Sequence, residues 1–420
     1  MTATTVVQSK RKLGRSAGLL DDYLGIFSAD LCAQRYAPDT IRHYVASAKM
    51  FARWLSRQQL EVDDIDEALV QRYVASLKRR LDRSKKKRRL PHTGVGLTHL
   101  VRSLRQQGAL PLHCDAPPST DAERWLQGYA YYLDRTLGCA PATRYKYLYF
   151  AKQFLAFYCE SDCLDWQLLQ AAHLTEFVQR EAAQRTGFGR KSPAVAMRVM
   201  VRYLINQGET RSGIEAAIPT IRQWKHAALP QSLTAADIER VLAACANDTL
   251  LERRNYTILL MLARLGIRAK EVAELTLDDI DWVEGCLVIR SSKTHCNRSL
   301  PLPQDVGDAL IAYLKHGRPN ATQRAVFLTH HAPFNPLQTA TAITHIAQQC
   351  LANAGIPVSP GHGAHLFRHA AATRMVQGGA SFKQIADVLG HQTLQTTAIY
   401  AKLNLAALSQ VALPWPGGAQ

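Results

Sequence analysis

Two stretches near the C-terminal end of the chain carry side chains that could bind an anion and move a proton. In the first, HLFRH, His365 and His369 flank Arg368, and in the second, LGHQTLQTTAIY, His391 stands nine residues before Tyr400. Histidine exchanges a proton near neutral pH, and an arginine fork binds the paired oxygens of a carboxylate or phosphate. A tyrosine hydroxyl becomes a nucleophile once its proton is removed. These residue types indicate a candidate reaction centre, although a buried structural tyrosine is the ordinary alternative.

A metal ion is the first hypothesis for this histidine-rich segment. His365 and His369 are four residues apart, which places them on one face of a helix, and His362 precedes them. No carboxylate or cysteine accompanies them, and the charge of Arg368 would repel a cation. We therefore expect no metal and no cofactor.

An arginine further upstream stands where one helix ends and the next begins. The segment NYTILLMLARLGIRAKEVAELTLDDIDW predicts a buried helix, a break at Gly266 and an amphipathic helix from about Ala269, with Arg268 at the junction. An arginine beside a helix N-terminus adds a bidentate donor to the backbone N–H groups, which together suit a phosphate. A capping role or an ion pair, for instance with Glu271, is the commoner alternative.

A lysine occupies the expected tip of a β-hairpin. In GCLVIRSSKTHCNRSLPLP, two short aliphatic runs flank SSKTHCNR, a pattern typical of two strands joined by a turn, and Lys293 lies in that turn. Most lysines are exposed surface charges, so its position alone assigns it no catalytic role.

Helices are expected to position the remaining candidates. The segment GHGAHLFRHAAATRMVQGGASFKQIADVLGH predicts an alanine-rich helix and a second helix that ends at Gly390-His391. Upstream, LTAADIERVLAA opens a helix with Thr234 as its cap and Asp237 three residues later, so we expect a domain boundary near Leu229.

The front half of the chain contains an internal repeat. APDTIRHYVASAKMFARWL begins at Ala37 and APATRYKYLYFAKQFLAFY begins at Ala140, so matching residues recur at a constant offset of 103. Apolar residues recur every three or four positions, which predicts helices, and a duplicated four-helix module of about ninety residues is the simplest account.

Each copy carries a basic, glycine-containing stretch before its last helix. The basic residues concerned are Lys85, Lys86, Lys87, Arg88 and Arg89 in the first copy, and Arg190 and Lys191 in the second. A solvated loop is the common alternative for a charge run, but the same position is basic in both copies. We therefore expect these loops to contact DNA phosphates.

Composition narrows the class of protein. The chain has 420 residues, 47% of them hydrophobic, and 51 Lys and Arg against 34 Asp and Glu give a net charge of +17. Such a charge favours a polyanionic partner. No run of about eighteen apolar residues occurs, and the nine cysteines form no CxxC pair; Cys159 and Cys163 alone are too few for a zinc site. We therefore expect a multidomain cytoplasmic protein without a membrane partner.

Four segments in order resemble the signature boxes of the tyrosine recombinase (phage integrase) family. They are LGIRAKEVAELTLDDID, the hairpin lysine followed by NRSLPLP, HLFRH, and LGH followed nine residues later by the tyrosine of TTAIYAKL. The resemblance covers about residues 231–405 strongly, and each front repeat is similar to the family's helical core-binding domain. Most relatives carry one such domain, whereas this chain has two. Phe367 stands where relatives usually have leucine, which we expect to alter packing and not chemistry.

The resemblance implies a role for each matching residue. The roles are phosphate clamps (Arg268, Arg368), general acid (Lys293), proton handling or hydrogen bonding (His365, His391) and nucleophile (Tyr400). Two fixed guanidinium groups can stabilise the charge that grows on the non-bridging phosphate oxygens. A covalent 3′-phosphotyrosyl intermediate keeps the energy of the broken bond, so strands could be rejoined without a metal ion or ATP.

The expected fold is mainly α-helical with a small β-sheet or hairpin. Two tandem helical, SAM-like core-binding domains would precede a mixed α+β tyrosine recombinase catalytic domain. The expected boundaries are a basic N-terminal tail (1–18), the first core-binding domain (19–110), a linker (111–118), the second core-binding domain (119–212), a linker (213–229), the catalytic domain (230–405) and a C-terminal tail helix (406–420).

The indicated function is that of a site-specific DNA recombinase or integrase serving a mobile genetic element. Its partners would be double-stranded recombination sites, bound by a homotetramer or by a hetero-tetramer with related recombinases. A non-enzymatic DNA-binding protein is one alternative, which the complete set of six residues argues against. A type IB topoisomerase-like enzyme is another, and the duplicated front domains and the tail after Tyr400 favour recombination over it. The DNA sequence recognised and the choice among integration, excision, resolution and transposition stay open.

Overall fold

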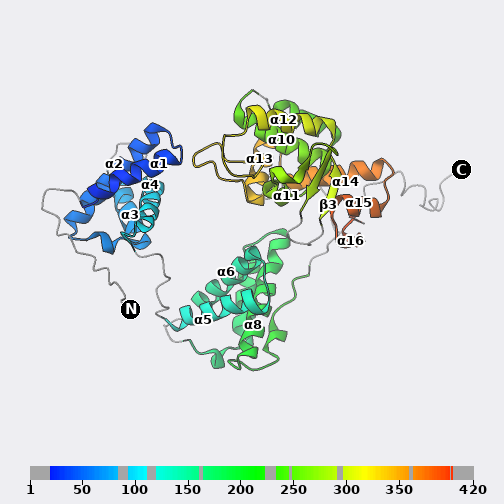
Figure 1. Cartoon of the computed structure of the whole chain (residues 1–420). Helices are drawn as coiled ribbons and strands as arrows, with labels where there is room; N and C mark the ends of the chain where they lie inside the picture. Colours follow the sequence, from blue (N-terminus) through cyan, green and yellow to red (C-terminus); the bar gives the residue numbers. More distant parts are fainter. Residues whose placement is uncertain are drawn as a thin grey trace, which may run out of the picture. The chain divides into compact units, whose positions relative to one another are not determined.

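Figure 1 shows the computed structural model of the chain, which divides into two compact units, one formed by residues 111–227 and one that combines 1–110 with 228–420. The structure describes residues 19–83, 93–110, 120–159, 164–222, 233–245, 248–290, 297–358, 363–397 and 399–400. Lys293, the run Lys85–Arg89 and the expected tails at 1–18 and 406–420 lie outside these residues.

The first copy of the repeat folds, within the described residues, as four α-helices and a short 3-10 helix. These are α1 (Asp21–Ala33), α2 (Pro38–Arg57), η1 (Val62–Asp64), α3 (Glu67–Arg83) and α4 (Thr93–Gln106). Helix α2 begins with Pro38 in its first turn, where a proline costs no hydrogen bond. Its buried face carries Tyr44, Ala48, Phe51 and Leu55 at helical spacing and packs mainly against α4.

The second copy has the same succession of longer helices in its described residues, with additional short turns. Its elements are α5 (Asp121–Tyr131), the π-helical turn η2 (Tyr132–Thr136), α6 (Pro141–Tyr158), η3 (Trp166–Leu168), α7 (Ala171–Ala183), η4 (Gly187–Lys191), α8 (Ser192–Asn206) and η5 (Ile214–Ala217). Ala151 and Phe154 of α6 are 0% exposed, as are Ala48 and Phe51 at the matching positions of α2. The matching residues therefore include equivalent core positions of two similar helical packings.

Two features of the second copy differ from the expectations. The basic stretch expected as a loop is the 3-10 helix η4, which leads directly into α8. Residues 213–218, expected as part of a linker, pack on this copy: Ile214 and Ile218 are buried in its core, and Arg198 Nη2 donates to Ile218 O at 3.0 Å. The glycine and polar residues before Ile214 are typical of a linker. Ile214 and Ile218, four positions apart, nevertheless form an apolar face that packs into the core of the second copy.

The C-terminal part surrounds a small antiparallel sheet with helices. Its described elements are α9 (Ala235–Ala244), α10 (Leu250–Leu265), α11 (Ala269–Glu274), η6 (Leu277–Asp279), β1 (Ile280–Asp281), β2 (Cys286–Ile289), β3 (Arg298–Pro301), α12 (Gln304–His316), α13 (Ala340–Asn353), α14 (Ala364–Gln377), α15 (Phe382–Leu389) and α16 (Leu394–Thr397). The strand order is β1-β2-β3, and Leu287 of β2 pairs with Ile280 and with Leu300. These elements confirm the expected fold class of a mainly helical chain with a small sheet.

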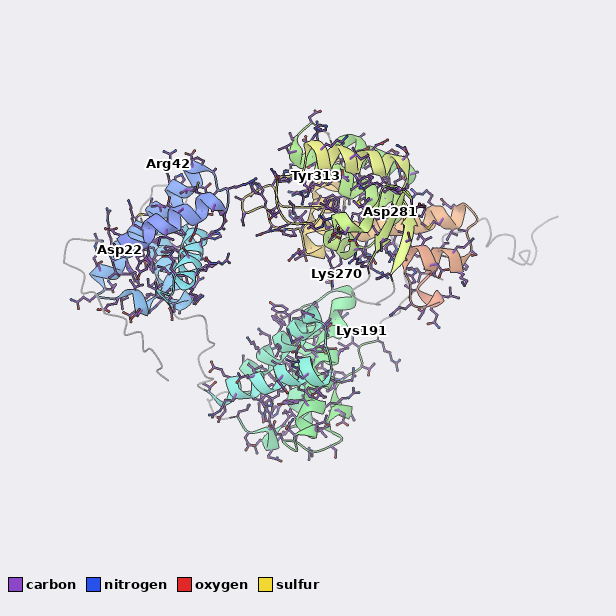
Figure 2. All side chains as sticks on the ribbon, in the orientation of Figure 1. Asp22, Arg42, Lys191, Lys270, Asp281 and Tyr313 are labelled. Atoms are coloured by element: carbon purple, nitrogen blue, oxygen red, sulfur yellow. The ribbon has the colours of Figure 1, made fainter. Side chains whose placement is uncertain are left out.

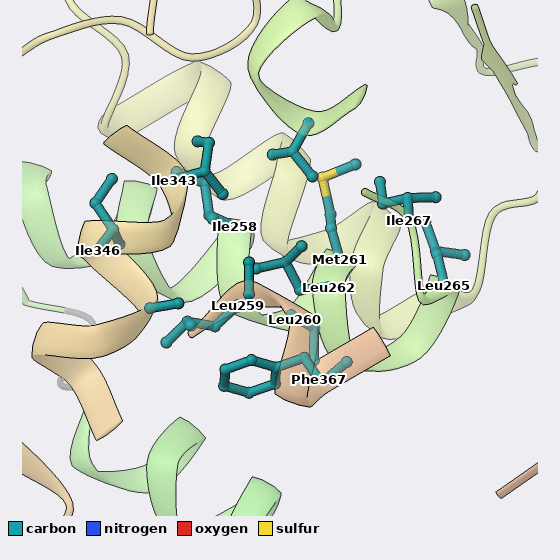
Figure 3. Packing of buried hydrophobic residues seen from close by; sticks show 14 of the residues in the cluster. Ile258, Leu259, Leu260, Met261, Leu262, Leu265, Ile267, Ile343, Ile346 and Phe367 are labelled. Carbon is teal, nitrogen blue, oxygen red and sulfur yellow. The ribbon is translucent and has the colours of Figure 1, made fainter. Parts of the chain in front are cut away.

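Helix α10 is the centre of this part. All residues from Ile258 to Ala263 are buried, so the helix is apolar on every side over this stretch. It packs against α12 and α14, and Figure 3 shows Ile258–Leu262 among the side chains of neighbouring helices. Phe367 of α14 lies in the same core and is 0% exposed, so this departure from the family pattern has a packing role.

The expected local boundaries are confirmed where they can be seen. Thr234 and Asp237 form a capping box at the start of α9, and Gly266 ends α10. The hairpin pairs β2 with β3, and Gly390 ends α15 in a left-handed conformation. Among the helices in the described stretches, none has the length and apolar character needed to cross a membrane.

Candidate active site

The end of α10 brings three helices of the C-terminal part together. Gly266 has a φ of 62°, and a Cβ at this position would lie 2.9 Å from Ala371 Cβ of α14 and 3.0 Å from Leu389 Cδ2 of α15. The backbone of Gly266 therefore packs closely against α14 and α15. Arg268 follows this turn directly, so the close approach places it beside α14 and the end of α15.

Three arginine side chains donate to the last carbonyl oxygens of α15. The pairs are Arg298 Nε to Val388 O (2.8 Å), Arg368 Nη2 to Leu389 O (2.7 Å) and Arg268 Nη2 to Gly390 O (2.7 Å). The last carbonyls of a helix lack partners within it and carry partial negative charge, which attracts cations. The helix end and the three guanidinium groups therefore hold one another in place.

Arg368 is the most enclosed of the three. It is 4% exposed, and its Nη1 donates to Gly266 O at 2.8 Å, so the end of α10 and the end of α15 hold it from two sides. Burial, together with the charge of Arg268, lowers the pKa of Arg368 to about 10, which leaves it protonated at neutral pH. The side chain of Arg268 is 27% exposed and is therefore more open to a ligand.

Glu271 joins two of the arginines. Its carboxylate accepts from Arg298 Nη1 (3.1 Å) and Nη2 (2.8 Å), and from the backbone N and Nη1 of Arg268 (both 2.8 Å). Burial alone would raise the pKa of Glu271, but the hydrogen bonds and charges of the two arginines hold it below its usual value. The ion pair considered from the sequence for Arg268 is thus present.

The charges of this cluster suit a phosphodiester. Arg268, Arg298 and Arg368 carry three positive charges and Glu271 carries one negative charge, a net charge of plus two. A phosphodiester carries one negative charge, and its pentavalent transition state carries two. A site that is more complementary to the transition state than to the ground state is the requirement for catalysis.

His391 directly follows Gly390, whose carbonyl oxygen accepts a hydrogen bond from Arg268. Its Nδ1 is 2.8 Å from Oγ1 of Thr397, a fully buried residue of α16. Burial and the neighbouring arginine charges lower the pKa of His391 to about 4, so the ring is neutral at physiological pH. A neutral imidazole has one donor and one acceptor nitrogen, and the contact with Thr397 fixes the orientation of the ring.

Tyr400 is held by a histidine of α14. Its hydroxyl is 2.8 Å from His369 Nδ1, and the residue is 2% exposed within a small cluster that includes Ile385 and Leu389. Burial raises the pKa of Tyr400, and the charge of Arg368 opposes that effect. The ring of His365 stacks one turn away, 6.1 Å from the ring of His369, and His365 is exposed.

Arg268 and Arg368 converge on the end of α15, directly before His391, and Tyr400 contacts His369 of α14. Sequence reasoning assigned no role to Arg298, to Thr397 or to His369 as the tyrosine's partner. The available signals were indirect: Arg298 belongs to the NRSLPLP segment, and Thr397 stands three residues before Tyr400. In the described parts of the chain, no group of three His, Cys, Asp or Glu side chains could hold a metal ion.

Arg190 and Lys191 lie where η4 meets α8 in the second copy; Lys191 is labelled in Figure 2. Beside them is an open hollow of about 350 Å³, lined by Tyr145, Lys146, Tyr149, Phe150, Arg185, Gly189 and Ser192. Tyr145 is 75% exposed and Tyr149 is 40% exposed. Exposed aromatic rings among basic side chains are typical of surfaces that contact nucleic acids.

Comparisons with known proteins show the family of the chain. Residues 231–406 match the model described as "Phage integrase family". A putative integrase/recombinase, y4rA, from Sinorhizobium fredii is 35% identical over 402 residues, which is 95% of each chain. Tyrosine recombinase XerC from Lacticaseibacillus casei is 29% identical over 300 residues, covering 67% of this chain and 95% of XerC.

A solved structure extends the comparison to the fold. The XerH site-specific recombinase, in a post-cleavage complex with a palindromic difH substrate, is similar with a TM-score of 0.53 and 19% identity, covering 70% of this chain and 84% of that one. The similar structure shows the fold, and the family match with these relatives shows a tyrosine recombinase, an enzyme class that breaks and rejoins DNA. The chain belongs to the phage integrase family, with a relative that matches it over almost its whole length.

Proposed function

We propose that this tyrosine recombinase cuts DNA at specific sites through attack by Tyr400 and rejoins the strands from a covalent 3′-phosphotyrosyl intermediate. The observation that carries the proposal is the convergence of Arg268 and Arg368 on the end of α15, next to His391 and to the helix that holds Tyr400. Lys293, five residues before Arg298 in sequence, is the proposed general acid.

Arg268 and Arg368 can bind a phosphate while they keep their hydrogen bonds within the protein. A guanidinium group has five N–H donors. The described contacts use two donors of Arg268 and two of Arg368, so each group retains donors for the non-bridging oxygens of the scissile phosphate. With Thr397 donating to Nδ1 of neutral His391, the Nε2–H of that ring donates to a phosphate oxygen as well.

The proposed reaction balances without a cofactor. The Tyr400 oxygen forms a bond to phosphorus as the bond from phosphorus to the 5′ oxygen breaks. In the unreacted arrangement the phenolic hydroxyl contacts His369; once Tyr400 has turned outward, its proton passes to His365, the proton-handling group that the family resemblance implies. Lys293 gives a proton to the departing 5′ oxygen. The reverse reaction with another 5′-hydroxyl joins new strands.

Tyr400 must turn outward before it attacks. Its hydroxyl contacts His369 Nδ1 at 2.8 Å and the residue is 2% exposed, so attack on a phosphate held by Arg268 requires a movement of Tyr400. We infer that DNA binding is accompanied by a displacement of Tyr400 away from His369. Until then the buried hydroxyl, with its raised pKa, is a poor nucleophile.

DNA contact by the front of the chain supports site-specific recombination. We assign Arg190 and Lys191 beside the tyrosine-lined hollow to the DNA interface, and propose the same for Lys85–Arg89. The name of the relative y4rA, integrase/recombinase, favours service to a mobile genetic element. We propose assembly as a tetramer, alone or with related recombinases, and a cytoplasmic location with access to DNA.

The test is covalent trapping on DNA from the region around the gene. Nicked duplexes that release the 5′ product should accumulate a protein–DNA adduct with the wild-type chain and none with Tyr400→Phe, which loses only the nucleophilic oxygen. Tyr256→Phe is the matched control, because Tyr256 lies in the N-terminal half of α10, away from the turn at Gly266, and should retain full adduct formation. An adduct at wild-type level in Tyr400→Phe would place the nucleophile elsewhere.

A second assay separates recombination from relaxation. Supercoiled circles that carry one or two cleavage sites are incubated with the protein. A recombinase yields exchanged products only when two sites are present, whereas a topoisomerase-like enzyme relaxes circles that carry one site.

A further inference from the structure

Arg298 lies, partly buried, at the junction of three elements. It is the first residue of β3, its side chain is 11% exposed, and its guanidinium group contacts both α11 and α15. Nη1 and Nη2 form a fork with the two oxygens of Glu271, while Nε donates to Val388 O at 2.8 Å. Bidentate contacts of this kind fix geometry more firmly than a single ion pair does.

Both contacts lead to residues assigned to the phosphate. Through Glu271, Arg298 fixes the carboxylate that accepts from the backbone N and from Nη1 of Arg268. Through Val388, it fixes the end of α15, whose next carbonyls hold Arg368 and Arg268 and whose next residue after Gly390 is His391. One side chain therefore restrains both halves of the proposed clamp.

The geometry of Arg298 differs from that of a residue that binds the phosphate directly. Three of its five donors are used by Glu271 and Val388, whereas Arg268 and Arg368 each use two in their described contacts. A Cβ at Gly390 would lie only 2.7 Å from its Nη1, so the backbone after α15 covers its outer edge.

We propose that Arg298 is a positioning residue for strand cleavage, which holds Arg268 through Glu271 and His391 through the end of α15. This inference rests on the proposed function. Arg298 stands five residues after Lys293, so β3 also joins the chain segment of the proposed general acid to the arginine cluster. Positioning of reacting groups is worth large factors in rate, since a misplacement of about 1 Å can cost on the order of a hundredfold.

The test compares Arg298→Met and Arg298→Lys with Arg264→Met. Arg264 is a matched control because it also bridges two carboxylates, Asp305 and Glu239, in the same domain but outside the arginine cluster. The substrate is the nicked duplex on which the wild-type chain forms its adduct. Duplex binding, thermal unfolding and the single-turnover rate of adduct formation are measured for each variant.

We expect Arg298→Met to cleave about a hundredfold more slowly with a dissociation constant within about twofold of wild type. Arg298→Lys should recover part of the rate, because an ammonium group can pair with Glu271 but cannot also reach Val388 in the same fork. The acid limb of the pH–rate profile should move to higher pH in Arg298→Met, since burial of Glu271 is then less compensated.

The following results would contradict the positioning role of Arg298, each through a different measurement. A cleavage rate for Arg298→Met equal to that of Arg264→Met would remove the positioning role. A large loss of binding with a shallower salt dependence would show that Arg298 contacts the phosphate directly. If Arg298→Met unfolds, Glu271→Gln and its combination with Arg298→Lys take its place, and additive rate losses in the double variant would overturn the coupling. Absence of an adduct with the wild-type chain would refute the proposed function instead.

Discussion

Replacing Gly390 with alanine is expected to disable strand cleavage in a protein that still folds. Gly390 has a φ of 66°, and an added Cβ would lie 2.7 Å from Arg298 Nη1 and 3.5 Å from Arg268 Nη1. The Arg298 guanidinium would have to retreat by about 0.7 Å to reach the 3.4 Å of an ordinary contact. It has little freedom to do so, because Glu271 and Val388 hold it.

The substitution has two separable costs. The left-handed backbone costs an alanine about 1–2 kcal/mol of folding stability. The clash displaces the arginine cluster, and a displacement approaching 1 Å costs on the order of a hundredfold in rate. Gly379→Ala is the matched control: Gly379 has a φ of 82°, but an added Cβ there would meet nothing within 4 Å. It therefore has the backbone cost alone.

Both variants should be compared with wild type by thermal unfolding, by duplex binding and by the rate of adduct formation on a nicked duplex. We expect similar losses in the free energy of unfolding for the two variants, and cleavage about a hundredfold slower in Gly390→Ala only. Equal cleavage rates in the two alanine variants would refute the coupling between the end of α15 and the arginine cluster.

Four further outcomes follow from the site and from the second copy of the repeat. Thr397→Ala should slow cleavage about tenfold through loss of its hydrogen bond with His391, and Thr397→Ser should recover the rate. The pKa of His391 is lowered to about 4, so its ring should stay neutral, and an acid limb near pH 7 that depends on His391 would contradict the assignment. Lys293→Ala should slow cleavage about a hundredfold, and a sulfur leaving atom, which needs no proton, should restore most of the rate; no selective rescue would exclude Lys293 as the general acid. Replacing Arg190 and Lys191 with glutamine should make the slope of log affinity against log salt shallower by about one unit per lost phosphate contact, and an unchanged slope would remove them from the DNA interface.

Local structure followed closely from local sequence. The break at Gly266, the cap at Thr234, the β2–β3 hairpin and the end of α15 at Gly390 were all predicted from neighbouring residues. Each depends on interactions within a few positions, such as helical periodicity, capping or a left-handed glycine, so short stretches of sequence contain the information. The order and spacing of the boxes likewise predicted the family that the comparisons show.

The predictions failed where packing at a distance competes with local appearance. Residues 213–218 look like a linker because glycine and polar residues precede them, yet the core of the second copy takes up Ile214 and Ile218. The basic stretch before α8 has the glycines of a loop, yet it forms the 3-10 helix η4. In both cases packing against the neighbouring helices determines the conformation of the segment. The residues of the segment alone do not indicate where those helices lie.

The sequence by itself supplied the inventory of the candidate site: Arg268 and His391 at predicted element boundaries, Arg368 on a predicted helix, and Tyr400 from the family resemblance. Only the tertiary structure decided how they are held. Arg298 meets Val388 across 90 positions, Arg368 meets Gly266 across 102, and Arg268 meets Gly390 across 122. It also paired Tyr400 with His369. Such contacts depend on how α10, α14 and α15 pack against one another, and the pattern within any one segment carries no information about that packing.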